Sequence, residues 1–313
     1  MKWVIAGGSG FIGRYILRYF SEKQEEITVL SRNPHRAEKK VPIPGIRWVA
    51  WDGRTTGEWV TVLEGADVVV NLAGHPIAGV WTVPRKQKIY HSRINSTRAL
   101  VKALREVKNP PQTFIQISAT GFYGNRGDEI LTEESEQGSG FLAAVVDQWE
   151  AVSRDVEAMG IRRIILRAGV VLGRDGGFLP VLLPSFNWFL GGMPGDGMNW
   201  FSWIHVKEIP PILEFVLHHA TLTGVLNGVA PEPVRFEEFC QTLGKVIGRP
   251  CWLKIPEFLI RLLPGHQGEE MVLVSQRVVP ARLVQAGYQF QFPTLYVALS
   301  EIFNKQGVPV TSD

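Results

Sequence analysis

The sequence has few cysteines, little excess charge and no long apolar segment. Only Cys240 and Cys251 occur among 313 residues, which excludes a disulfide framework and favours a reducing compartment. The formal net charge is only +3, so nucleic acid is not an expected partner. No apolar run approaches the ~20 residues that span a bilayer. The chain opens with a predicted strand rather than a targeting peptide. We therefore expect a cytoplasmic protein without a membrane partner.

The first 32 residues hold the most informative pattern in the chain. An apolar run at 3–6 is followed by GGSGFIG, then by a helical apolar pattern, then by a second apolar run at 27–30. The order of strand, glycine turn, helix and strand is half of a dinucleotide-binding fold. The spacing is GxxGxxG rather than GxGxxG, and its place between a strand and an amphipathic helix makes it specific. No Gly-Lys-Ser/Thr follows, which excludes a P-loop.

Each glycine of the turn has a separate physical role. Gly7 permits the sharp turn, Gly10 lets the backbone approach a pyrophosphate, and Gly13 lets the helix pack close to the strand. The helix that begins at Phe11 and Ile12 would hold the anion with its free N–H groups. The alternative is a glycine-rich turn that binds no ligand.

The end of the second strand predicts the cofactor. An NAD site usually places a carboxylate there for the ribose 2′-hydroxyl, whereas this chain has Ser31 and Arg32. A hydroxyl and a guanidinium suit a 2′-phosphate, and His35 and Arg36 are further candidates for the same patch. The sequence therefore predicts NADP(H) rather than NAD(H). The alternative is that Arg32 is an ordinary solvated loop residue.

Strands and helices alternate along the first half of the chain. Further strands are predicted at 46–51, 66–72, 113–118 and 161–166, with helices through 59–63, 84–107 and 141–159 and a polar loop from 32 to 40. Asp52 ends the third strand and is either an adenine contact or a turn residue. The small-residue sequence NLAG ends the fourth, where Leu72, Ala73 and Gly74 would pass close to the nicotinamide ribose. This alternation predicts an α/β fold, a Rossmann-type doubly wound parallel sheet.

Beyond residue 172 glycine, proline and aromatic residues increase. We expect a loop and helix region at 173–203 that covers the cofactor and shapes a pocket. A strand at 222–229 and helices at 235–247, 256–263, 269–277 and 294–303 would follow. The predicted domains are 1–172, with about 203–230 returning to it, and a smaller C-terminal α/β lobe at 173–313. The two cysteines are expected on a buried helix and on a strand.

Seven motifs in order give the chain a family resemblance. They are GGSGFIG at 7–13, NLAG at 71–74, Asn95 within SRINSTRAL, SATGFYG at 118–124, RAGVVLG at 167–173, WIHVKEI at 203–209 and GVLNGVAPEPV at 224–234. The chain resembles the extended short-chain dehydrogenase/reductases, a superfamily of nucleotide-sugar epimerases and dehydratases. Its tail, QRVVPARLVQAGYQF at 276–290, is similar to the atypical "epimerase family" subgroup, sometimes labelled cell-division inhibitors.

The resemblance implies a nicotinamide cofactor bound by a Rossmann lobe, with Asn95, Ser118 and Arg167 among its contacts. It implies a small-molecule substrate of the nucleotide-sugar kind. It also implies a homodimer formed by the helices at 84–107 and 141–159.

The family's acid/base machinery is missing. Active members carry a Tyr-x-x-x-Lys pair on the helix before the sixth strand, and alignment on Glu150 puts Leu142 and Val146 at those positions. Neither side chain can transfer a proton. The remaining catalytic candidates are Tyr123, Ser118, Thr120 and His205. For Tyr123 and His205 the alternative is a structural role.

Three functions stay open on these grounds. The protein is an NADP-dependent enzyme of the epimerase/oxidoreductase type that uses other groups, a redox-responsive NADP(H)-binding regulator, or an interaction protein for which the nucleotide is a folding ligand. The Gly- and Trp-rich region at 173–203 favours the enzyme, because it suits the enclosure of an organic ligand. No metal site is predicted.

Overall fold

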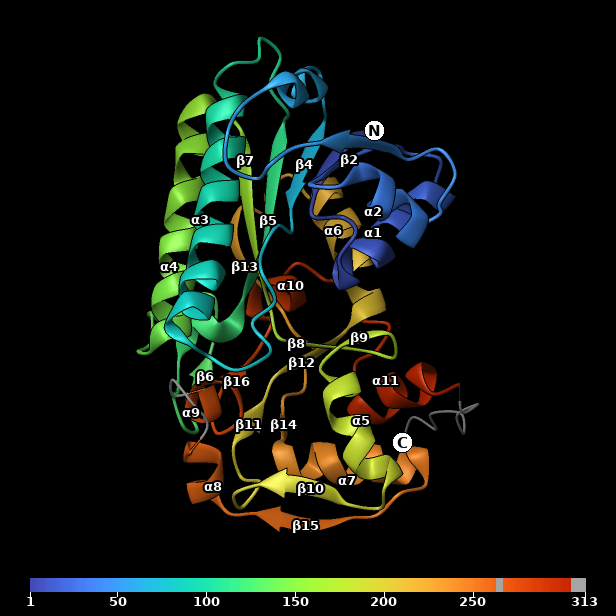
Figure 1. The fold of residues 1–313 in the computed structure, drawn as a ribbon, viewed down its shortest axis with the longest axis vertical. Coiled ribbons are helices and arrows are strands. Elements are labelled where there is room, and N and C mark those ends of the chain that lie inside the picture. Colours follow the sequence, from blue (N-terminus) through green and yellow to red (C-terminus); the bar gives the residue numbers. More distant parts are fainter. Residues whose placement is uncertain (263–266, 305–313) are drawn as a thin grey trace. The chain divides into compact units, whose positions relative to one another are not determined.

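The computed structural model describes residues 1–262 and 267–304, which form two compact units. The first comprises residues 1–122, 141–167 and 209–226, and the second comprises 123–140, 168–208 and 227–313. The chain therefore passes repeatedly between the units. Each is described separately, and Figure 1 labels their elements.

The first unit contains a seven-stranded sheet in the order β13-β7-β5-β4-β1-β2-β3. The printed pairs β1–β2, β2–β3, β1–β4 and β4–β5 are all parallel. The elements of this unit are β1 (Lys2–Ala6), α1 (Phe11–Glu22), β2 (Glu26–Ser31), α2 (Pro34–Lys40), β3 (Arg47–Ala50), the 3-10 helix η1 (Glu58–Leu63), β4 (Val68–Asn71), α3 (Val83–Leu104), β5 (Thr113–Ala119), α4 (Phe141–Val152), η3 (Ser153–Met159), β7 (Arg162–Ala168), α6 (Ile209–His218) and β13 (Gly224–Gly228). The last residues of β7 and β13 are grouped with the second unit.

Helices cover both faces of this sheet, as the unbroken apolar strands require. Val4 and Ala6 of β1 belong to a core cluster that also takes in residues of α3. The alternate residue Trp3 is fully buried and packs on Phe20 of α1, with ring centroids 4.0 Å apart. Figure 1 shows α3 and α4 together on one face and α1 and α6 on the other. The predicted doubly wound α/β fold is confirmed.

The second unit is built from short strands and helices. They are the 3-10 helix η2 (Thr120–Tyr123), which begins in the first unit, β6 (Ile130–Leu131), β8 (Val170–Gly173), β9 (Gly176–Gly177), α5 (Leu179–Asn187), β10 (Gly191–Pro194), β11 (Trp200–Phe201), β12 (Trp203–His205), η4 (Val206–Glu208), β14 (Val234–Arg235), α7 (Phe236–Ile247), β15 (Cys251–Ile255), α8 (Glu257–Arg261), α9 (Gln267–Met271), β16 (Arg277–Val278), α10 (Ala281–Gln285) and α11 (Leu295–Ile302).

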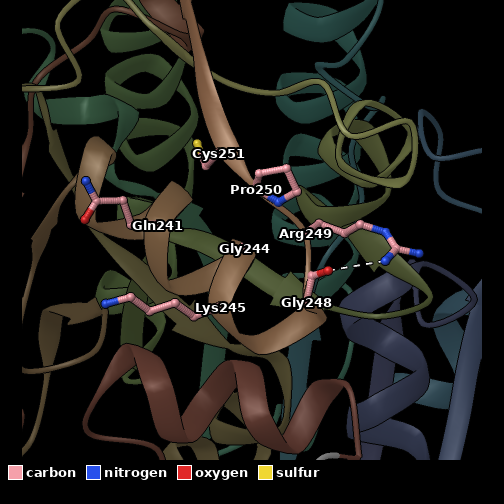
Figure 2. A pocket seen from close by; sticks show the side chains of 7 residues that line it. All are labelled: Gln241, Gly244, Lys245, Gly248, Arg249, Pro250 and Cys251. Carbon is pink, nitrogen blue, oxygen red and sulfur yellow. Dashed lines mark hydrogen bonds between the residues drawn. The ribbon is translucent and has the colours of Figure 1, made fainter.

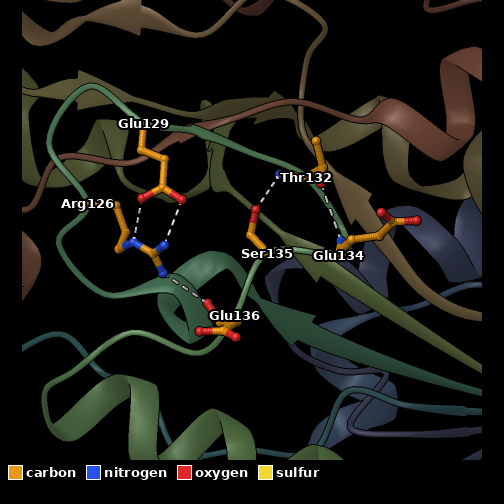
Figure 3. Close-up of polar contacts among 6 residues, drawn as sticks. All are labelled: Arg126, Glu129, Thr132, Glu134, Ser135 and Glu136. Atoms are coloured by element: carbon orange, nitrogen blue, oxygen red, sulfur yellow. Dashed lines mark hydrogen bonds and ion pairs between the residues drawn. The ribbon is translucent and has the colours of Figure 1, made fainter.

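The loop at 124–140 of the second unit is held by its own polar side chains (Figure 3). Arg126 forms a bidentate pair with Glu129, at 2.8 and 2.6 Å, and donates to the Glu136 carbonyl. Ser135 accepts from the Thr132 backbone N–H. The Arg126 N–H also bonds the Ser275 carbonyl at 3.0 Å, which ties this loop to the segment before β16.

Two predictions about local structure are wrong. The polar segment after Arg32 is not a loop but contains helix α2. Asn33 caps it by accepting from the Arg36 N–H at 3.0 Å, and Pro34 fits its first turn. Apolar periodicity missed this helix because Ala37 is the buried residue within it.

The predicted helix at 269–277 ends at Met271, and an extended segment leads into β16, which pairs with β6. In this segment a side chain from elsewhere in the unit bonds to backbone carbonyls that would accept helical hydrogen bonds in a longer helix. Asn199 donates to the Val272 and Val274 carbonyls.

The other helices and strands lie close to their predicted positions. The helix predicted at 141–159 continues beyond Val152 as 3-10 helix, and the helix at 59–63 is itself 3-10. The predicted end of the helix at 256–263 lies outside the described residues. Region 173–203 holds helix α5 as expected, together with short strands that the glycine content concealed.

Candidate functional site

From β1 the chain adds β2 and β3 on one side of the sheet and then β4 and β5 on the other, so the strand order reverses between β1 and β4. In open α/β sheets a ligand binds outside the carboxyl ends of the strands at such a point. Gly7 follows β1 there, with a φ of +81° that few other residues adopt. A Cβ on Gly7 would lie 3.0 Å from the Ala73 nitrogen and the Leu72 carbonyl. The glycine turn and the loop after β4 therefore pack directly against each other.

The remaining glycines place α1 as the sequence predicts. A Cβ on Gly13 would lie 2.3 Å from the Gly8 carbonyl oxygen, so only glycine allows this approach of helix and turn. Gly10 occupies the N-cap without a side-chain hydrogen bond, and the first turn contains no acidic residue. Phe11 and Ile12 are partly buried in that turn. The N-terminus of α1 thus presents backbone donors that no side chain of the helix caps.

Ser31 and Arg32 lie where β2 ends. The Ser31 hydroxyl accepts a hydrogen bond from the Asn33 N–H at 3.3 Å, which shapes the turn. Arg32 is exposed and has no ion-pair or hydrogen-bond partner within the described part of the chain. A guanidinium without an internal partner is available to an anionic ligand.

A group of cations that the sequence analysis missed lies around His75, after β4. Burial lowers the pKa of His75, and four positive side chains lower it further: Arg85, Lys88, Arg93 and Arg32. Arg32 belongs to the loop after β2, so the positive field of these side chains extends from the carboxyl end of β4 to that of β2. One of these cations could have been found from the sequence, because Arg93 lies two residues before the predicted cofactor contact Asn95 in SRINSTRAL.

Arg93 holds the loop that follows β4. Its guanidinium donates to the His75 and Ile89 carbonyls at 3.0 and 3.1 Å and lies 5.2 Å from the centre of the Trp149 ring. Burial lowers its pKa to about 10. A Cβ on Gly74 would come within 3.2 Å of the guanidinium carbon. The loop predicted to pass the nicotinamide ribose is therefore fixed by a partly buried cation.

Asn71 fixes the same loop from within the sheet. It is fully buried, donates to Thr97 Oγ1 at 2.9 Å and accepts from the Ala73 N–H at 3.1 Å. Trp149 Nε1 donates to the same Thr97 hydroxyl. Asn95 lies partly buried in α3, and its predicted cofactor contact stays a prediction.

Asp52 forms a turn. Its carboxylate accepts from the Thr55 N–H at 2.9 Å, the Thr55 hydroxyl at 2.7 Å and the Arg54 N–H at 2.7 Å. These bonds, led by that from the Thr55 backbone, lower the pKa of Asp52. The structure supports the turn interpretation, and the adenine contact stays a prediction.

Ser118 and Arg167 meet at Glu150. Ser118 Oγ donates to Glu150 Oε1 at 2.6 Å, while Arg167 donates to both carboxylate oxygens at 3.0 and 2.7 Å. All three side chains are nearly inaccessible. The Arg167 guanidinium also lies 3.4 Å from the centre of the Phe122 ring. The two predicted cofactor contacts are thus joined in a buried polar network.

The positions of the absent Tyr/Lys pair are apolar in space as well as in sequence. A Cβ on Gly121 would lie 3.5 Å from Leu142 Cβ and 3.9 Å from a Val146 methyl group. Val146 is 4% exposed and Thr120 is 6% exposed. Helix α4 therefore faces the segment after β5, as the family arrangement requires, without the phenol and amine that move protons.

Two catalytic candidates lie in the second unit and have structural partners. Tyr123 is fully buried, and its hydroxyl donates to Asn227 Oδ1 at 2.7 Å. His205 stacks on Phe292, with ring centroids 4.0 Å apart, and its Nε2 is 2.9 Å from Glu301 Oε2. Burial lowers the pKa of His205 to about 4. These surroundings favour the structural alternative for both residues.

The aromatic residues of region 173–203 divide into two groups. Phe186, Phe201 and Trp203 belong to the core cluster of the second unit. Trp188 and Phe189 are instead 79% and 54% exposed. This distribution weakens the argument that the aromatic content exists to enclose a ligand.

Within the described residues, no group of three or more His, Cys, Asp or Glu side chains could hold a metal ion. Over the same residues, no helix has the length and apolar character needed to span a membrane.

Comparisons with known proteins agree with this arrangement. The model of the NAD dependent epimerase/dehydratase family matches residues 3–227, and that of a domain of unknown function, DUF1731, matches 255–302. "Epimerase family protein SDR39U1 homolog, chloroplastic" from Arabidopsis thaliana is 36% identical over 95% of this chain and 85% of its own. Epimerase family protein YfhF from Bacillus subtilis is 34% identical over 96% of this chain and 98% of its own.

A solved structure extends the likeness to three dimensions. Human epimerase family protein SDR39U1 (isoform 2), crystallised with NADPH, is 32% identical and covers 97% of this chain and 100% of its own, with a TM-score of 0.85. The family match spans the whole glycine turn, the sheet and helix α4. The chain therefore belongs to the NAD-dependent epimerase/dehydratase family, in the atypical extended short-chain dehydrogenase/reductase group that carries the additional C-terminal domain.

Proposed function

We propose that the protein binds NADP(H) at the carboxyl ends of β1, β2 and β4 and is an epimerase/oxidoreductase-like member of its family. The observation that carries the proposal is the field of four cations along this edge, with Arg32 unpaired among the described residues. NADP(H) bears a pyrophosphate and a 2′-phosphate, so its charge complements that field. The NADPH in the human relative's structure supports the same cofactor.

Each part of the cofactor has a proposed contact. Gly7, Gly10 and Gly13, with Phe11 and Ile12, would surround the pyrophosphate. Ser31 and Arg32 would bind the 2′-phosphate, and Leu72, Ala73, Gly74 and Asn95 would line the nicotinamide ribose.

The test is a paired titration with NADPH and NADH, followed by nicotinamide fluorescence. The wild type should prefer NADPH, and Arg32→Gln should weaken NADPH binding about tenfold or more, because a charge-assisted contact to phosphate is worth ~1.5–3 kcal/mol. NADH affinity should change little. Lys39→Gln is the matched control, since it removes an exposed cation in the last turn of α2 that has no proposed contact with the cofactor. Equal affinity of the wild type for both nucleotides would contradict the proposal.

A second candidate is a nucleotide-binding regulator that responds to the redox state of the cofactor. The apolar pair Leu142 and Val146 opposite Gly121 favours it, because the usual proton transfer has no donor there. Hydride exchange between bound cofactor and any of a panel of nucleotide sugars would exclude this candidate. The nucleotide-sugar substrate and the homodimer are family expectations that this panel and a sedimentation measurement would test.

Tyr123→Phe separates a chemical from a structural role for that phenol. Removal of the hydroxyl leaves buried Asn227 Oδ1 without this donor, so we expect a loss of ~1–3 kcal/mol in the free energy of unfolding. Cofactor binding should be unchanged. If turnover is found, a selective loss of kcat with normal stability would instead assign Tyr123 to the chemistry.

A further inference from the structure

The two cysteines of the chain meet in the second unit. Cys240 is fully buried on α7, and Cys251 is the partly buried first residue of β15. Cys251 packs against the core cluster that contains Cys240. The two side chains interact, and this interaction shifts the pKa of each thiol. The last two turns of α7 and a short loop separate the two cysteines in the sequence, and the fold brings them together.

The backbone around the thiols supports close approach. Gly244 lies one turn after Cys240, and a Cβ there would be 3.7 Å from Cys251 Cβ. Strand β10 pairs with β15 in parallel register, with Gly191 opposite Cys251. Cys240 Sγ is 3.7 Å from the Gly192 carbonyl of the same strand. A disulfide requires Cβ atoms ~3.5–4.5 Å apart, and the contact at Gly244 shows that helix α7 comes within this range of Cys251 one turn after Cys240.

Cys251 opens onto a surface pocket with two basic residues. The pocket has a volume of about 410 Å³ and is lined by Gln241, Gly244, Lys245, Gly248, Arg249, Pro250 and Cys251 (Figure 2). Among the described residues neither Lys245 nor Arg249 pairs with a carboxylate. The lining of the pocket therefore includes two cations and a thiol, a combination that suits a small molecule with several carboxylate groups.

The two thiols differ in reactivity. The hydrogen bond from Cys240 lowers the pKa of Cys251, against the opposing effects of burial and of Glu237. The bond to Cys251, together with burial, raises the pKa of Cys240. Cys251 is partly exposed and lines the pocket, whereas Cys240 is fully buried, so Cys251 is the attacking sulfur that a small disulfide can reach and Cys240 is the second thiol.

We propose that Cys251 and Cys240 form a thiol–disulfide exchange site for a small disulfide that carries carboxylates, of which oxidised glutathione is the type. The Cys251 thiolate attacks one sulfur of the disulfide, whose S–S bond breaks to release one thiolate. Cys240 attacks the Cys251 sulfur of the mixed disulfide, the bond from Cys251 to the small molecule breaks, and the proton of Cys240 passes to the departing thiolate, which leaves as the second small thiol. The protein is oxidised to the Cys240–Cys251 disulfide, and the small disulfide is reduced to two thiols. The site is separate from the proposed nucleotide site.

The experiment treats reduced full-length protein with oxidised glutathione, quenches with acid and records intact mass over time. The wild type should lose the mass of two hydrogen atoms. Cys240→Ser should accumulate a glutathione adduct, because its mixed disulfide cannot be resolved. Cys251→Ser should remain unmodified, with Cys251→Ala as a second variant and a thermal unfolding curve as the test of folding. An adduct on folded Cys251→Ser at the wild-type rate, or none on Cys240→Ser, would overturn the assignment.

The role of the pocket is tested with disulfides of different charge. Lys245→Gln combined with Arg249→Gln should slow reaction with oxidised glutathione about fivefold, the scale of partly exposed ion pairs. The rate with uncharged 2-hydroxyethyl disulfide should stay unchanged, which controls for the reactivity of the thiol itself. Equal slowing with both disulfides, or with neither, would overturn the recognition of carboxylates. NADPH plays no part in these assays, so failure of the proposed nucleotide function would leave their outcome unaffected.

Discussion

Arg167 and Glu150 form a bidentate ion pair in which the side chains are only 5% and 7% exposed. Water is largely excluded, so each charge depends on the other for solvation. The Ser118 hydroxyl adds a further bond to the carboxylate. The residues come from β7, α4 and β5, and the pair therefore joins three elements of the first unit at one point. Its contribution is best measured by breaking it from each side.

We expect Arg167→Met to lower the free energy of unfolding by ~3–5 kcal/mol, since it leaves a buried carboxylate without its cation. Glu150→Gln with Arg167→Met should be less damaging than the sum of the two single changes, because neither charge then remains buried alone. Urea unfolding of the four proteins gives the coupling energy. Strict additivity of the two losses would show that the ion pair does not act as a unit.

At the scale of elements, α1 depends on one glycine within its first turn. Helix propensity alone favours alanine over glycine by ~1 kcal/mol. At Gly13, however, a methyl group would meet the Gly8 carbonyl oxygen at 2.3 Å. Both partners in this contact are backbone, so neither can move away unless helix α1 is displaced from the glycine turn. Steric exclusion therefore outweighs propensity at this position.

Gly13→Ala should accordingly destabilise the protein by ~1–3 kcal/mol and weaken nucleotide binding by moving the N-terminus of α1. The control is Gly57→Ala, at a residue in extended conformation where the new Cβ would be 3.8 Å from Trp59 Cδ1. Thermal unfolding and NADPH titration of both variants test the point. A Gly13→Ala protein as stable as the Gly57→Ala protein would contradict the role given to this glycine.

Elements with strong apolar patterns were predictable, and those made by polar contacts were not. The strands of the parallel sheet and helices α1, α3 and α7 follow directly from runs and periodicity in the sequence. Helix α2 depends instead on a cap at Asn33, and strand β16 depends on side-chain bonds from distant residues such as Ser202, which accepts from the Val278 N–H. The glycine turn was predictable because sterics specify its residue types. The cation field around His75 was not, since it joins residues of two loops and a helix.

At the scale of the whole molecule, the stability of the fold should fall in mild acid. Burial lowers the pKa of His205 from 6.5 to about 4, with Lys207 acting in the same sense and Glu301 opposing it. The folded protein thus keeps His205 neutral while the unfolded chain takes up a proton. Its contribution is complete above pH 6.5, is lost as pH falls toward 4, and reaches ~3 kcal/mol in all.

Denaturant unfolding at pH 7 and pH 5 should show the effect. Between these values the wild type should lose ~2 kcal/mol more than His205→Gln, which has no imidazole to protonate. Both proteins share all other titrating groups, so the difference between their changes in unfolding free energy reports His205 alone. An equal loss of unfolding free energy in the two proteins would show that His205 is protonated without cost in the folded state.

The interleaving of the two units has a consequence for synthesis on the ribosome. Strands β1 to β5 are complete by residue 119, but β7 and β13 of the same sheet emerge only after segments that belong to the other unit. The sheet lacks a neighbour for β5 while residues 123–140 leave the exit tunnel, and it lacks a neighbour for β7 while residues 168–208 leave it. Neither unit can be completed before the other has begun, so the last strand of the sheet, β13, is added only after two segments of the other unit have been made.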